Sequence, residues 1–157
     1  MKLKDRIKEF YKKIVGEDAS PEFIARGWAI GMFYGCLIPF GLQLILSIPT
    51  AFILKGSKVG ATIGTFITNH FTVFVIYPLQ CYVGSIILRN GLSYDIIKDA
   101  MLKVINEQTY DSLVSCGADL VYSFFMGGFL LTAIMTPITY IGVLYMVKSY
   151  RSKKEQQ

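Results

Sequence analysis

The side chains of this chain that could do chemistry inside its long apolar stretches are uncharged amides and hydroxyls. Gln43 and Asn69 each carry a carboxamide that can hydrogen-bond a polar ligand. Facing hydrocarbon without a partner costs such a group on the order of a few kcal/mol, so we expect both to face protein or a polar pocket. Polar groups at i, i+4 and i+7 also predict stripes along helices. The three sets are Gln43, Ser47 and Thr50; Thr65, Asn69 and Thr72; and Thr132, Thr136 and Thr139.

Acid–base and metal chemistry have little support in the same stretches. They contain no carboxylate pair for a general acid and base, and Cys and His do not occur at metal-ligand spacing. His70 is the single histidine, and it is either a hydrogen-bonded packing residue or a group that contacts a ligand or carries a proton. An intramembrane enzyme would have to rely on Cys36, Cys81 or His70. We therefore expect a protein that is not an enzyme and that uses no cofactor or metal.

Three stretches without Asp, Glu, Lys or Arg must position these groups, namely residues 27–54, 59–88 and 120–147. Each exceeds the roughly 20 residues that a helix needs to cross a bilayer core of about 30 Å. Hydrophobic residues make up 53% of the chain, and its mean hydropathy is positive. The pattern predicts an all-α fold, a polytopic integral membrane helical bundle with short interfacial helices.

The first stretch contains Pro39, Gly41 and Pro49, which make one straight helix unexpected there. Two topologies are open: a single crossing, or a re-entrant hairpin with its tip near Pro39 to Gly41. Only the hairpin places thirteen of the 16 Lys and Arg residues on the cytoplasmic side. We therefore favour a broken or re-entrant first segment in a multi-pass protein of the cytoplasmic (inner) membrane, with both termini cytoplasmic.

This topology divides the chain into two parts. Residues 1–19 form a basic amphipathic helix on the cytoplasmic side, and residues 20–157 form a single transmembrane domain. The second stretch, 59–88, is either one tilted helix or a second broken one. Residues 89–119 hold more acids than cations and predict an external interfacial segment with a short helix.

Small residues predict where helices pack closely. Gly27, Gly31 and Gly35 recur every four residues, which lets another helix backbone approach along that face. Gly64 is assigned the same packing role in the second stretch. An enclosed pathway in so short a chain predicts a homo-oligomer, and the face formed by Gly27, Gly31 and Gly35 is a candidate contact between copies.

Three groups of residues between Pro21 and Tyr77 form a set of motifs. They are Pro21, Glu22, Ile24, Ala25, Gly27, Ala29, Gly31, Phe33 and Gly35; Pro39, Phe40, Gly41 and Gln43; and Gly64, Thr65, Asn69, Thr72 and Tyr77. Together these motifs resemble the domain of unknown function 2062 family of small prokaryotic membrane proteins. The resemblance implies a bacterial or archaeal cytoplasmic-membrane protein. Because similar proteins are sometimes joined to glycosyltransferase domains that use polyprenyl phosphate carriers, it also implies a link to lipid-linked glycan or envelope lipid handling.

The expected function is binding or translocation of an anionic amphiphilic lipid, such as a polyprenyl phosphate or a phospholipid. Basic residues at the chain ends favour anionic headgroups as partners and disfavour nucleic acid. The alternative is a membrane scaffold or accessory subunit for an envelope glycosyltransferase, which transports nothing. The expected substrate-binding residues are Gln43, Asn69, Pro39, Gly41, Thr65, Thr72, His70 and Arg26.

Overall fold

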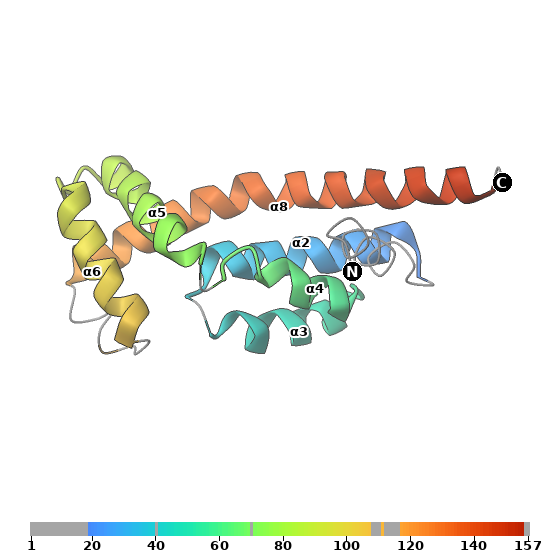
Figure 1. The fold of residues 1–157 in the computed structure, drawn as a ribbon, viewed down its shortest axis with the longest axis horizontal. Helices are drawn as coiled ribbons and strands as arrows, with labels where there is room; N and C mark the ends of the chain where they lie inside the picture. The colour runs from blue at the N-terminus through green and yellow to red at the C-terminus, as the bar shows by residue number, and fades with distance from the viewer. Residues whose placement is uncertain (1–18, 40, 70, 108–110, 112–116, 156–157) are drawn as a thin grey trace, which may run out of the picture.

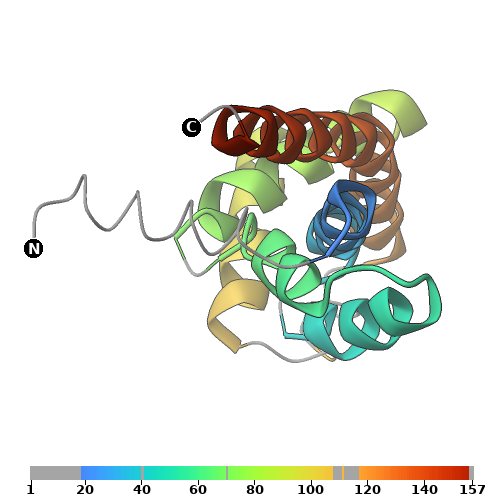
Figure 2. The ribbon, with the colours of Figure 1, turned by 90° about the vertical axis from the view of Figure 1, so that its right-hand side faces the viewer.

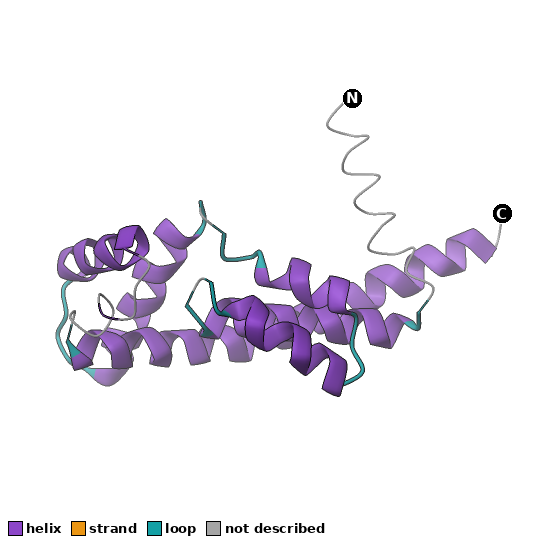
Figure 3. Ribbon diagram, turned by 90° about the horizontal axis from the view of Figure 1, so that it is seen from below, coloured by secondary structure: helices purple, strands orange, loops and turns teal. Residues whose placement is uncertain are grey.

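The computed structural model describes residues 19–39, 41–69, 71–107, 111 and 117–155. All regular secondary structure in these residues is helical, as the sequence predicts (Figure 3). The amphipathic helix predicted over residues 1–19 falls outside them apart from Ala19, and so do Phe40 and His70. The helices are α2 (Pro21–Leu37), α3 (Gln43–Ile53), α4 (Lys58–Thr65), α5 (Val73–Leu88), α6 (Tyr94–Glu107) and α8 (Ala118–Glu155).

The helices α2 and α5 pack against the long helix α8. The helix α2 runs antiparallel along the C-terminal half of α8, while α5 runs antiparallel along its N-terminal half (Figure 1). Arg151 Nη2 donates to the Ala19 carbonyl at 2.6 Å at one end, and Gln80 Nε2 donates to the Phe124 carbonyl at 3.0 Å in the other half. The C-terminal end of α2 and the N-terminal end of α5 therefore meet near the middle of α8.

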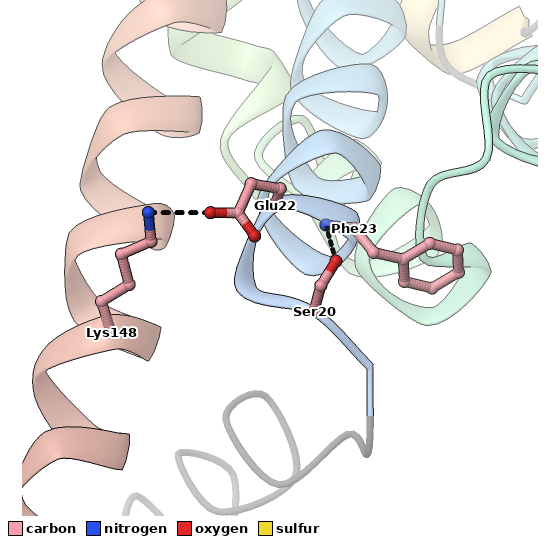
Figure 4. Close-up of polar contacts among 4 residues, drawn as sticks. All are labelled: Ser20, Glu22, Phe23 and Lys148. Atoms are coloured by element: carbon pink, nitrogen blue, oxygen red, sulfur yellow. Dashed lines mark hydrogen bonds and ion pairs between the residues drawn. The ribbon is translucent and has the colours of Figure 1, made fainter.

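The start of α2 combines three favourable features of a helix N-terminus. The Ser20 hydroxyl accepts a hydrogen bond from the Phe23 amide at 3.2 Å, and Pro21 takes the first turn, where no amide is needed. Glu22 lies at the positive end of the helix and pairs with Lys148 of α8 at 2.7 Å (Figure 4). The hydrogen bond from Lys148 lowers the pKa of the Glu22 carboxyl below its ordinary value.

This ion pair predicts a small pH dependence of stability. Because the pKa of Glu22 is lowered in the folded chain, the pair stabilises it at neutral pH, and that contribution is lost as the pH falls through the lowered pKa. Both side chains are more than a third exposed, so solvent screens most of the effect. We expect the wild-type Tm to fall slightly more than that of Glu22→Gln between about pH 7 and about pH 3. Parallel curves for the two proteins would contradict the assignment.

The first apolar stretch is broken and folds back on itself. The helix α2 ends at Leu37, Gly41 adopts a positive φ of 104° that favours glycine, and α3 begins at Gln43. At the other end of the hairpin, Arg26 Nη1 donates to the carbonyls of Leu54 at 2.8 Å and Lys55 at 3.2 Å. Residues 27 and 54 therefore lie at the same end of the molecule.

The second apolar stretch is also broken, which decides between the two alternatives left open by the sequence. The helix α4 ends at Thr65 and α5 begins only at Val73, so the predicted stripe of Thr65, Asn69 and Thr72 along one helix is wrong. The helix α4 runs parallel to α2 and packs on it. The helix α2 therefore contacts α8 on one side and the α3–α4 pair on the other (Figure 2).

The helix predicted after residue 91 is observed as α6. The Ser93 hydroxyl accepts from the Ile96 amide at 3.4 Å, and α6 packs Ile97 and Met101, both fully buried, against α5 and α8. Ile96, the residue before Ile97, is 59% exposed.

The described residues contain one helix that is long and apolar enough to cross a membrane, Ala118–Lys153. The helices α3 and α5 are apolar but shorter. All three leave large apolar side chains exposed, so the outer surface of the described helices is apolar along much of its length. Examples are Ile45, Phe52, Ile53, Val75, Phe129 and Ile141.

Candidate polar site where the helix breaks meet

The Gln43 carboxamide joins the first break to the second. Gln43 is only 3% exposed, and its Nε2 donates to the Ile38 carbonyl and to Thr68 Oγ1, both at 2.8 Å. A longer contact of 3.3 Å reaches the Gly35 carbonyl. Because the last carbonyls of a helix lack partners within it, Gln43 caps the C-terminal end of α2 from the first turn of α3.

Thr68 completes this cap and is absent from the sequence-based site. Its side chain is buried, and its hydroxyl donates to the Gly35 carbonyl at 2.8 Å, 33 residues away in the chain. Thr68 lies three residues after Thr65 and four before Thr72, so it shares the face of the predicted stripe even in a continuous helix. The predicted stripe omitted it, although this spacing is visible in the sequence.

Asn69 and Thr72 form a hydrogen-bonded turn immediately before α5, which itself has no side-chain cap. Asn69 Oδ1 accepts from the amides of Phe71 at 2.9 Å and Thr72 at 3.0 Å. Thr72 Oγ1 accepts from the Asn69 amide at 2.8 Å and donates to the Ile67 carbonyl at 2.7 Å. No hydrogen bond joins Asn69 to Gln43 in the part of the chain that is described. The two amides thus hydrogen-bond the chain itself, Gln43 at the end of α2 and Asn69 in the turn before α5.

The other predicted binding residues are spread over the hairpin. Thr65 is buried at the break, where its hydroxyl donates to the carbonyl of Thr62 at 2.7 Å. Pro39 is half-buried and Gly41 is exposed. Arg26 lies at the opposite end of the hairpin, where it caps α3. His70 falls outside the described residues.

The four predicted packing glycines lie where α2 and α4 touch. A Cβ on Gly27 would overlap the Ser57 backbone, and one on Gly31 would overlap the Ala61 backbone. A Cβ on Gly64 would lie 3.0 Å from the Gly31 Cα, and Gly35 faces Thr65. This corrects the expectation that the face of Gly27, Gly31 and Gly35 joins two copies, because α4 of the same chain already covers it.

Three residues at the two helix breaks belong to the motifs of the family resemblance. Gln43 hydrogen-bonds the end of α2 across the first break, and Asn69 and Thr72 form the turn before α5 at the second. The sequence matches the family described as "Uncharacterized protein conserved in bacteria (DUF2062)" over residues 4–156. The chain belongs to this family. No curated protein and no solved structure matches it.

A second amide of this DUF2062 chain lies beside the breaks and was also missed. Gln80 of α5 is 4% exposed, and its Nε2 donates to the Phe124 carbonyl, whereas its Oε1 has no partner among the described residues. Gly127 and Gly128 make room for it, since a Cβ on Gly128 would lie 2.6 Å from Gln80 Nε2. Gln80 lies within the uncharged stretch 59–88, which is a signal in the sequence that could have identified it. The sequence-based site included only the amides that lie next to a predicted break.

Proposed function

We propose that this DUF2062 protein is an integral protein of the cytoplasmic membrane that binds or translocates an anionic amphiphilic lipid. A polyprenyl phosphate and a phospholipid both have this chemistry. The observation that carries the proposal is that two helix breaks, between α2 and α3 and between α4 and α5, lie together beside the middle of α8. Two helices end there, two begin there, and neutral polar side chains lie among apolar helices. Broken helices that meet at membrane depth are a common way to build a site for a polar group inside a bilayer.

The apolar exterior supports placement in a membrane. Only 17% of the most apolar 18-residue part of α8 is buried by the rest of the protein, whereas the core helix of a water-soluble domain would be mostly buried. Phe71 is 84% exposed and Phe52 is 69% exposed. Contact with lipid would cover such exposed apolar side chains.

The distribution of charge supports the sidedness. Arg26, Lys55, Lys148 and Arg151 lie at one end of the bundle, since Arg26 contacts the 54–55 turn and Arg151 contacts the start of α2. The positive-inside tendency would make this end cytoplasmic. In that orientation α2 and α3 form a re-entrant hairpin, α4 and α5 form a broken crossing, and α8 returns to the cytoplasm.

Two features suit an anionic headgroup. Lys55 and Lys58 are exposed at the turn between α3 and α4, where Lys58 Nζ lies 4.9 Å above the Phe52 ring. They would attract a phosphate at the membrane surface. The helix α3 begins at the break without a side-chain cap on its amides, and a helix N-terminus favours negative charge.

A lipid-scrambling assay tests this function. The full chain is reconstituted into vesicles with tail-labelled phosphatidylglycerol or tail-labelled phosphatidylcholine, and the label accessible to external dithionite is followed. We expect the anionic lipid to move faster than in protein-free vesicles. Exchange of Lys55 and Lys58 together for Gln should slow it several-fold, because the attraction of charged groups at a surface is about 1 kcal/mol per cation.

Lys98→Gln supplies the control, because Lys98 is a cation of α6 in the other half of the molecule. That variant should move the lipid at the wild-type rate. Movement no faster than in empty vesicles, together with no anionic lipid retained in native mass spectrometry, would remove the proposal.

One observation favours the non-transporting scaffold instead. Both short hydrogen bonds of the Gln43 amide go to the chain itself, which suits a purely structural break. In that case the exposed apolar face of α3 would contact a membrane glycosyltransferase. Photo-crosslinking from Phe52 in living cells distinguishes the two, because only a scaffold would give one protein adduct with the glycosyltransferase.

A further inference from the structure

Three buried oxygens near the middle of α8 have no hydrogen-bond partner among the described residues. They are Gln80 Oε1, Thr132 Oγ1 and Thr136 Oγ1, and Gln80 and Thr132 are each only 4% exposed. The hydroxyls of Thr50 and Thr62, in contrast, donate to carbonyls of their own helices at 2.8 and 2.9 Å. Leaving a buried polar atom unpaired costs about 1–3 kcal/mol, so three such atoms in one region indicate that something else binds them.

Gly128 of α8 lies beside groups from α5 and α2. A Cβ on Gly128 would lie 2.6 Å from Gln80 Nε2, the nitrogen of the carboxamide that carries Oε1, and 3.2 Å from the carbonyl oxygen of Cys36. Thr132 follows one helical turn later on the same face of α8. Groups from α2, α5 and α8 therefore converge where the first break begins.

The free atoms in this region are oxygens that accept. The Gln80 amide nitrogen is already used by the Phe124 carbonyl, which leaves Oε1 available. Cys36 lies in the last turn of α2, whose C-terminal end carries partial negative charge. Neutral oxygens beside a helix C-terminus favour a cation, and the absence of any carboxylate from residues 27–54, 59–88 and 120–147 favours a single charge over a double one.

We propose that Gln80 Oε1, Thr132 Oγ1 and the Cys36 carbonyl form a binding site for a monovalent cation of the size of Na⁺. The ion would join α2, α5 and α8 at the level where both apolar stretches break. The site does not require that the chain carries a lipid, so its test is independent of the scrambling assay.

Thermal unfolding in nanodiscs of zwitterionic lipid tests the site. Tm is measured in NaCl, KCl and choline chloride at equal ionic strength, since a ligand that binds only the folded chain raises Tm with its concentration. We expect Na⁺ to raise Tm by several degrees relative to choline. Thr132→Val should abolish that difference, whereas Thr62→Val, which removes a hydroxyl bonded within its own helix, should keep it.

Gln80→Glu provides a second variant of nearly the same shape. A carboxylate there would bind the cation more tightly, so the Na⁺-dependent rise should be larger than in the wild type and should increase with pH. Equal stabilisation of the wild type by all three salts, or an unchanged Na⁺ effect in both Thr132→Val and Gln80→Glu, would overturn the proposal and leave water as the occupant.

Discussion

Gly127→Ala is expected to lose about 3 kcal/mol or more of the free energy of unfolding. An added Cβ would overlap the backbone carbonyl of Gln80, and backbone cannot rotate away as a side chain can. The helices α5 and α8 would have to separate, which would also disturb the hydrogen bond between Gln80 and Phe124. Equilibrium unfolding of the detergent-purified protein, followed by far-UV circular dichroism, measures the loss.

Gly142→Ala on the same helix is the matched control. No heavy atom lies within 4 Å of a Cβ built there, and alanine is a better helix former than glycine by about 0.5–1 kcal/mol. This variant should be as stable as the wild type or more so. Equal losses from the two substitutions would mean that α5 does not approach α8 at Gly127.

Gln43→Leu is expected to cost about 3 kcal/mol, because it removes both short hydrogen bonds of the cap on α2. The Ile38 carbonyl and the Thr68 hydroxyl would lose a donor in a buried site, while the leucine adds little apolar contact. Trp28, the single tryptophan, packs against Gly60 and so reports on α2 and α4. We expect its fluorescence to change at lower denaturant concentration than in the wild type.

Thr50→Val controls for the loss of a polar group from the same hairpin. The Thr50 hydroxyl is half-buried, donates within its own helix and contacts Tyr34. Its loss should cost less than 1 kcal/mol, at the lower end of the usual range for one hydrogen bond. A Gln43→Leu variant no less stable than Thr50→Val would show that the break is held by packing alone.

The helical class and the break at Pro39 to Gly41 could be predicted from the sequence because proline and glycine act on the backbone locally. The return of α3 to the start of α2 agrees with the charge pattern, since Lys55 follows the hairpin. The break in the second stretch could not be decided. Asn69 there stops a helix through hydrogen bonds of its own loop, and helical periodicity does not report such bonds.

The candidate site was harder to predict because it depends on contacts between distant segments. Gln43 was recognised as a polar group beside a break, but its partner Thr68 lies 25 residues away. Gln80 was missed for the same reason, since only the packing of α5 on α8 brings it to the middle of the bundle. Arg26 was assigned to a ligand on charge alone, whereas it satisfies carbonyls at the end of α3.

The position of α8 in the chain has a consequence for biosynthesis. Because α2 and α5 pack on different halves of α8, neither gains its main partner until the last helix has left the ribosome. If the protein is inserted into the membrane as proposed, the translocon would release a short hairpin and a discontinuous segment that can pack only on each other and on α6. Cells that synthesise a version stopped before residue 118 should accumulate little of it, since quality-control proteases would act on the unpaired segments first.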